Sequence, residues 1–141
     1  MEDEGAAPVE ATKDCYPPHV LMDFIADKLG LVHCYQDFCQ PKELPYIHRL
    51  QFAFADKNPS MQFQLFIDLS AWLFTKITDD ATFLRVDKFD DPNTAVNKLL
   101  MALRRLDFSL DFPSSKLKQA HGDAACSVLD FLTDTAVAKC F

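Results

Sequence analysis

Glycine is scarce in this sequence. Only three glycines occur among 141 residues, at Gly5, Gly30 and Gly122. Folds built from many strands and tight hairpins need residues that tolerate positive φ, and glycine usually supplies them. The shortage of glycine therefore favours the all-α fold class. A hydrophobic content of 49% with thirteen phenylalanines predicts a single core rich in aromatic rings.

Long apolar runs are also missing. No uninterrupted stretch approaches the roughly 20 residues that a membrane-spanning helix needs. The amino terminus is acidic and lacks the basic start of a signal peptide. These absences predict a soluble, cytoplasmic chain with no membrane insertion.

The cysteines follow no paired framework. There are five of them, at Cys15, Cys34, Cys39, Cys126 and Cys140. An odd number without regular spacing suits a reducing compartment. Although Cys34 and Cys39 lie near His33, a tetrahedral zinc site needs four converging ligands, and helical placement would separate the two sulfurs by more than a full turn. We therefore predict free thiols and no bound metal.

Catalytic signatures are absent from the sequence as well. It has no phosphate-cradling glycine loop and no Gly-x-Ser-x-Gly elbow. His121, Asp123 and Cys126 could be arranged as an activated thiol. However, Cys126 falls on an apolar stripe, where burial raises the pKa of a thiol and suppresses its reactivity. We predict no catalytic residues, no cofactor and no enzymatic activity.

Negative charge is concentrated at the amino terminus. The net charge is −7, and residues 1–15 hold five acidic residues against one lysine. These residues lack apolar periodicity and are predicted to be a flexible acidic leader, whereas residues 16–141 should form one domain. An acidic balance argues against nucleic-acid binding.

Apolar residues recur at helical spacing in four segments, and capping residues define where they begin. Asn58 and Asp91 each precede a proline, which fits the start of a helix. Gly30 is expected to cap the end of the first helix. The four expected helices span residues 17–30, 59–77, 92–106 and 123–139.

The segments between these helices are predicted to be short helices or ordered connections. A short helix is expected over 31–39, with Tyr35 and Phe38 facing inward, and a short turn or helix from Pro113 to near Gly122. Residues 41–59 form a connection in which Ile47 to Phe54 alternates weakly and could run extended against the core. In the central helix, the apolar stripe comprises Met61, Leu65, Phe66, Leu69, Trp72, Leu73 and Ile77. That stripe should be buried, with Trp72 in the core.

Three sequence words carry a family resemblance: QFQLFIDLSAWLF from Gln62 to Phe74, DDPN from Asp90 to Asn93, and DFPSSKLKQAHGDAACSVLDFL from Asp111 to Leu132. They resemble the amino-terminal domain of the intraflagellar transport protein 57 family, also called the huntingtin-interacting-protein-1 protein interactor family. The resemblance covers roughly residues 17–138. It implies a calponin-homology-like helical domain with four main helices and short connecting helices.

The resemblance also implies a function and partners. The family looks like a peripheral subunit of the intraflagellar transport B complex, acting in cilium assembly at the cilium or flagellum and the basal body. Its long coiled coil, which implies pairing with intraflagellar transport protein 38, is not expected within these 141 residues. The implied partner of this domain is the amino-terminal propeller region of intraflagellar transport protein 172.

Basic residues gather in the otherwise acidic sequence between Val96 and Ala120. They are Lys98, Arg104, Arg105, Lys116 and Lys118. One interpretation is an ordinary solvated surface. The other is a docking patch for an acidic protein surface. Arginine gives bidentate contacts to carboxylates, and a cluster of positive charge steers an acidic partner toward it. The alternative function for this patch is direct microtubule binding, because tubulin tails are acidic and related calponin-homology-like heads of kinetochore proteins bind microtubules.

Overall fold

The structure is a computed structural model that describes residues 16–87, 89–108 and 113–140. Those residues form helices, turns and loops, with no strand among them, and the predicted all-α fold class is confirmed. The predicted acidic leader, residues 1–15, lies outside the described residues. No helix in the described part of the chain is both long enough and apolar enough to cross a membrane.

Four long helices and one short helix make up the described domain. They are α1 (Pro18–Leu31), α2 (Pro59–Thr78), α3 (Pro92–Arg105), α4 (Ser114–Leu117) and α5 (Asp123–Cys140). Between α1 and α2 the chain forms a π-type turn, η2 (Tyr35–Cys39), and a 3-10 turn, η3 (Gln40–Lys42). The four long helices correspond to the four predicted segments.

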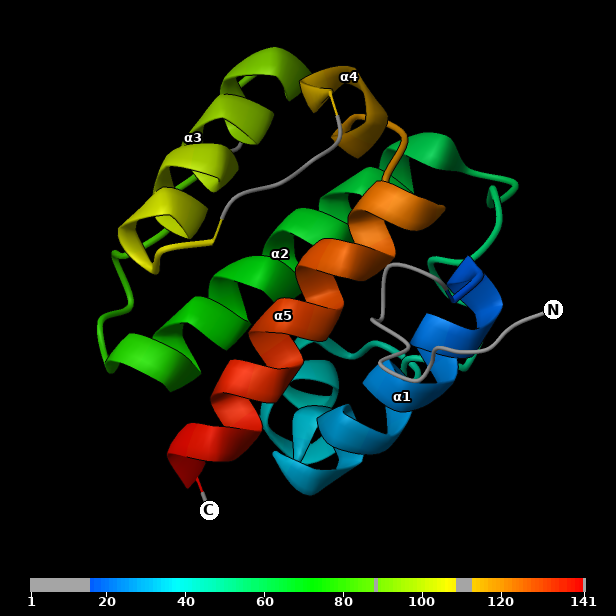
Figure 1. Cartoon of the computed structure of the whole chain (residues 1–141), viewed down its shortest axis with the longest axis vertical. Helices are drawn as coiled ribbons and strands as arrows, with labels where there is room; N and C mark the ends of the chain where they lie inside the picture. Colours follow the sequence, from blue (N-terminus) through cyan, green and yellow to red (C-terminus); the bar gives the residue numbers. More distant parts are fainter. Residues whose placement is uncertain (1–15, 88, 109–112, 141) are drawn as a thin grey trace, which may run out of the picture.

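Helix α5 is the centre of the arrangement. Figure 1 shows α5 between α1 and α2, and it contacts both of them, while α4 touches both α3 and α5. Every one of these helices sends apolar side chains into one buried cluster, which includes Ile25, Phe66, Leu99, Leu117 and Leu132. The helices therefore share a single core.

The predicted caps of α2 and α3 are confirmed. Asn58 Oδ1 accepts a hydrogen bond of 3.2 Å from the amide of Met61, and Asp91 Oδ1 accepts one of 2.8 Å from the amide of Thr94. Each cap satisfies an amide that has no partner within the first helical turn. Proline occupies the first helical position after each of these caps.

The predicted cap of α1 is wrong. Gly30 lies inside the helix, which continues to Leu31, and the left-handed residue is His33, with a φ of 61°. The amide of His33 donates to the carbonyl of Gly30 at 3.2 Å, and its own carbonyl accepts from the amide of Asp37 at 2.9 Å. The chain thus turns directly from α1 into η2.

Several burial predictions also need correction. Phe38 is buried as predicted, but Tyr35 is exposed, because the π-type turn changes which residues face inward. Met61 is 63% exposed, although it falls on the apolar stripe of α2. Trp72 is half-buried and packs tilted against Phe38, with ring centroids 5.8 Å apart. It therefore lies at the edge of the core.

The connection between η3 and α2 does not run extended, as the sequence suggested. The amide of Gln51 donates to the carbonyl of His48 at 3.0 Å, and the amide of Ala53 donates to that of Leu50 at 3.2 Å, so the segment forms consecutive turns. Its packing against the core is nevertheless confirmed, because Ile47, Phe52 and Ala53 are buried.

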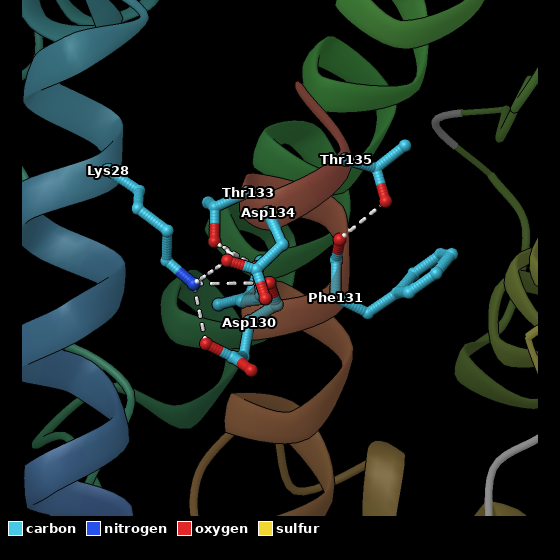
Figure 2. Close-up of polar contacts among 7 residues, drawn as sticks. Lys28, Asp130, Phe131, Thr133, Asp134 and Thr135 are labelled. Atoms are coloured by element: carbon cyan, nitrogen blue, oxygen red, sulfur yellow. Dashed lines mark hydrogen bonds and ion pairs between the residues drawn. The ribbon is translucent and has the colours of Figure 1, made fainter. Parts of the chain in front are cut away.

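A lysine clamp joins α1 to α5. Lys28 Nζ donates to Asp130 Oδ1 at 2.6 Å, to Asp134 Oδ1 at 2.8 Å and to the Asp130 carbonyl at 3.3 Å. Figure 2 shows the lysine reaching from α1 across to the two carboxylates on α5. The side chains of Lys28 and Asp130 are only 14% and 8% exposed, so this ion pair holds the two helices from inside their interface.

Candidate docking site

The structure separates the predicted basic residues into two groups. Lys98, Arg104 and Arg105 belong to α3, whereas Lys116 belongs to α4 and Lys118 follows it. Figure 1 shows α4 next to the end where α3 begins. Arg104 and Arg105 lie at the opposite end, about 20 Å away along a helix that rises about 1.5 Å per residue. The five residues therefore do not form one continuous patch.

Two of the basic residues have acidic neighbours within the domain. Lys98 Nζ donates to Asp90 Oδ2 at 2.6 Å, and this hydrogen bond holds the pKa of Asp90 below its usual range. The pKa of Asp91 is lowered as well, first by the hydrogen bond from Thr94 and to a smaller extent by the charge of Lys118. Part of the positive charge is thus already balanced inside the molecule.

Arg105 is engaged with an aromatic ring. Its guanidinium carbon lies 4.0 Å from the centroid of Phe83, and the Phe83 ring stacks on Phe74 at 5.2 Å. A cation over a ring face is attracted by the ring quadrupole. Arg105 consequently helps to fasten the loop after α2 to the end of α3, while Arg104 beside it is exposed.

The described cysteines Cys34, Cys39, Cys126 and Cys140 are free, and Cys15 lies outside the described residues. Cys34 and Cys39 lie closer together than helical placement predicted. The wider π-type turn brings residues five apart to the same side, and the two thiols share a hydrogen bond. Burial raises the pKa of both. No group of three metal-ligating side chains occurs among the described residues.

Cys126 is not arranged as a nucleophile. Its thiol donates to the carbonyl of Phe52 at 3.4 Å, and burial, followed by the charge of Asp123, raises its pKa to about 12. His121 Nδ1 instead lies 2.9 Å from the carbonyl of Gln119. The thiol is therefore a buried donor that fixes the connection before α2.

Two hollows, which share Asp68 in their lining, lie along α2 and together make up a groove. Its first part, of about 270 Å³, lies between Leu44, Pro45 and Ile47 on one side and the first half of α2 on the other. Its second part, of about 470 Å³, lies between η2 and η3 and the second half of α2, and includes Phe38 and Trp72. Asp68 lines both parts. We call the whole feature the α2 groove.

Gln62 fixes one wall of the α2 groove. Its side chain is buried, and its Nε2 donates to the carbonyls of Gln51 at 3.0 Å and Phe54 at 2.9 Å. Its Oε1 accepts from the amide of Asp56 at 3.2 Å. All three bonds join α2 to the connection, so the Gln62 amide satisfies backbone groups of this segment.

Helix α5 holds the same wall from the other side. The amide of Gly122 donates to the carbonyl of Phe52 at 2.8 Å, in addition to the bond from Cys126. The Phe52 ring is buried edge-to-face against Phe66, with centroids 6.0 Å apart. Residues 44–56 are therefore a fixed part of the domain, and we call them the groove wall.

Large apolar side chains are exposed on the groove wall and at the start of α2. Tyr46, Leu50 and Phe54 are between 50% and 65% exposed, and Met61 is 63% exposed. Sequence analysis missed this surface, because the wall has no helical stripe to assign its residues to one side. The available signal was a proline-bounded connection that carries more apolar residues than a solvated loop needs.

Comparison with known proteins gives a consistent result. The family model for intra-flagellar transport protein 57 matches residues 22–140. Intraflagellar transport protein 57 homologs of Xenopus laevis and Mus musculus are each 34% identical, over 92% and 96% of this chain. Intraflagellar transport protein che-13 of Caenorhabditis elegans is 30% identical over 86% of it. The matches cover 30%, 31% and 29% of these relatives, so the chain spans about a third of their length.

Proposed function

Because the chain belongs to the intraflagellar transport protein 57 family, we propose that it is a non-catalytic interaction module of a peripheral subunit of the intraflagellar transport B complex. The module docks onto another transport subunit during cilium assembly, at the cilium or flagellum and the basal body. The match over residues 22–140 carries this proposal. The chain spans about a third of the length of its curated relatives, so the role that their names state is proposed for this chain.

A docking role is supported by the division of apolar side chains between a buried core and the exposed surface. The helices share one closed core, yet Tyr46, Leu50 and Phe54 on the groove wall remain exposed, as does Met61, which lines the α2 groove. Exposed apolar surface next to a groove is typical of sites where a protein partner binds. A partner that covered these side chains would remove them from water and gain free energy from doing so.

The partner follows from the family resemblance. We propose the amino-terminal propeller region of intraflagellar transport protein 172 as the partner of this domain, and a calponin-homology-like arrangement for residues 16–141. Pairing with intraflagellar transport protein 38 is proposed for the coiled coil of the family, outside this domain. The basic residues of α3 and α4 are proposed contacts for acidic surface on the partner, with Arg104 and Lys118 at opposite ends.

Calorimetry with the propeller region tests the proposal. Titration into the 141-residue chain should give saturable heat with a dissociation constant in the micromolar range or below. Absence of binding at tens of micromolar would contradict the assignment. The variant with Lys116→Glu and Lys118→Glu then tests the basic residues separately, because it should weaken binding without altering the helical circular dichroism.

Direct microtubule binding is the second candidate, and the exposed side chains of Arg104, Lys116 and Lys118 favour it. Acidic tubulin tails would be attracted to these residues, although the division into two groups offers less positive charge at any one place. Co-sedimentation with microtubules at low salt decides the matter. If the chain pellets equally with Lys116→Glu and Lys118→Glu, these lysines are not the site.

A further inference from the structure

We propose that the α2 groove binds a positively charged amphipathic helix of a partner protein. This inference rests on the proposed docking function and specifies its surface and the chemistry of its ligand. It differs from the expectation based on the basic residues, which would attract an acidic partner to α3 and α4. Three properties of the groove support it: length, lining and charge.

The length of the groove matches a short helix. From Met61 to Thr75 it follows α2 for fourteen residue steps. At about 1.5 Å per residue this is about 21 Å, which equals about four turns of a helix lying alongside α2. Helices bound in grooves insert apolar side chains spaced three and four residues apart, and four turns supply three or four of them.

The lining is apolar on both sides. Leu44 and Ile47 face Leu65 across the first part, and Phe38 and Trp72 line the second. The side chain of Met61, which is exposed, also lines the first part. An occupant therefore needs apolar side chains along one face, as an amphipathic helix has.

The charge of the groove selects a basic occupant. Asp56 and Asp68 line the first part, no lysine or arginine does, and neither carboxylate has an ion-pair partner among the described residues. Asp68 accepts from the neutral amide of Gln64 at 2.9 Å, so within the part of the chain that the structure describes no cation offsets its charge.

The second part is lined by one cation and two carboxylates. Lys42 lies over the ring of Phe38 at 5.6 Å, and Asp37, which pairs with Lys76 at 3.3 Å, lines this part together with Asp68. Lysine or arginine on an incoming helix would thus meet unpaired carboxylates in the first part of the groove, and opposite charges favour both association and orientation.

The groove is preorganised for such an occupant. Gln62 and the backbone of Gly122 hold its wall in place, so binding needs little additional ordering of the chain. Two other occupants have unfavourable charge. The leader, residues 1–15, carries a net −4, and a second copy of this chain carries −7, so each would bring negative charge toward Asp56 and Asp68.

Fluorescence of Trp72 provides the test, because it is the single tryptophan of the chain and lines the groove. The probe is a synthetic peptide of about 18 residues, long enough for the groove, with leucines on one face, lysines beside them and no tryptophan. Its matched control carries glutamate in place of every lysine. The lysine peptide should change Trp72 emission saturably and bind at least about tenfold more tightly than the glutamate peptide. Equal binding of the two peptides overturns the proposal.

A pair of charge variants locates the binding. Asp56→Asn with Asp68→Asn should weaken the lysine peptide about fivefold or more, by removing both unpaired carboxylates. The control, Asp87→Asn with Asp107→Asn, removes the same charge from exposed residues that do not line the groove and should bind like the parent. If both double variants bind equally, general charge attraction explains the affinity and the groove proposal is wrong.

Three further measurements separate the outcomes. If deletion of residues 1–15 by itself changes Trp72 emission, the leader occupies the groove and the proposal is overturned. If light scattering shows dimers that Asp56→Asn with Asp68→Asn disrupts, a second copy occupies the groove and the proposal is likewise overturned. The same double variant is then titrated with the propeller region used above. If this double variant binds the propeller region normally while the parent does not bind the lysine peptide, the docking function is retained and only the groove assignment is wrong.

Discussion

The α1–α5 interface and the groove wall are both held by long-range contacts, but they use apolar residues differently. In the interface, Leu21, Ile25 and Leu29 of α1 are buried, and the Lys28 clamp is itself largely shielded from water. In the groove wall, Phe52 is buried while Phe54, two residues later, is 58% exposed. The interface therefore buries its apolar residues, whereas the wall divides its apolar residues between the core and the surface.

The difference teaches where binding surface can arise in a small helical domain. A long helix places its apolar residues on one stripe, and packing against a neighbour buries most of that stripe. The wall is a series of turns, fixed by Gln62 and by the amide of Gly122, so its side chains need not share one direction. Irregular backbone held by a few hydrogen bonds can keep apolar residues exposed without loss of order.

The largest predicted effect on stability distinguishes the buried phenylalanine of the groove wall from the exposed one. Phe52→Ala should lower the free energy of unfolding by about 4 kcal/mol, because it removes a buried ring packed on Phe66. Phe54→Ala should change it by less than about 1 kcal/mol. Urea denaturation followed by circular dichroism measures both. Similar losses in the two variants would mean that the wall is not divided in this way.

The lysine clamp tests the interface half of the comparison. Lys28→Met keeps the aliphatic stem but removes the ammonium group that pairs with the buried Asp130, and should cost about 2 kcal/mol, less than the loss of a fully buried pair because Asp134 is partly solvated. The matched control is Arg49→Met, which removes the ion pairs of Arg49 with Asp23 and Asp27. Those partners are well exposed, so the midpoint of denaturation should stay at the parent value. Equal shifts would show that burial of the clamp contributes nothing.

A gain in stability is expected on the buried side of α2. Ser70 is fully buried, and its hydroxyl has no hydrogen-bond partner among the described residues. Ser70→Ala should raise the free energy of unfolding by about 1 kcal/mol, because it removes an unsatisfied polar atom and favours the helix. Thermal unfolding is the measurement. A loss would indicate that the hydroxyl is satisfied in solution.

The smallest predicted effect is a pH dependence of stability caused by the buried thiol of Cys126, and it appears only above neutral pH. Burial raises the folded-state pKa of Cys126 to about 12, whereas an unfolded cysteine titrates near about 8.5. Its contribution to stability is therefore complete below about pH 8.5 and declines as pH rises toward about 12. Denaturation midpoints between neutral pH and about pH 9.5 should fall less steeply in Cys126→Ala than in the parent. Parallel slopes would contradict this.

Much of the fold was predictable because its signals are local. Asn58, Asp91 and the prolines after them define helix starts within three residues, and the apolar stripes identify the long helices. The burial of Phe38 and the packing of the wall against the core also followed from the pattern. The position of Trp72 at the edge of the core did not follow from the pattern. An apolar stripe shows which face of a helix turns toward the core, but not how completely a neighbour covers each side chain.

The candidate site was harder to predict, since it depends on contacts between distant segments. Lys116 and Lys118 are close in sequence to Arg104 and Arg105, but α4 lies next to the start of α3, at the opposite end from the two arginines. The function of Gln62 depends on turns that bring the carbonyls of Gln51 and Phe54 onto one side chain. Neither arrangement leaves a periodic signal in the sequence.

The carbonyl of Phe52 has a consequence for the timing of folding. It accepts from Gly122 and Cys126, which lie at least seventy residues further along the chain. Contacts of such separation form late, because a long loop must close before they are made. The groove wall is therefore completed only when α5 has been synthesised and docked. A nascent or truncated chain without α5 would lack the finished surface, so a partner that reads this surface would select domains that have already folded.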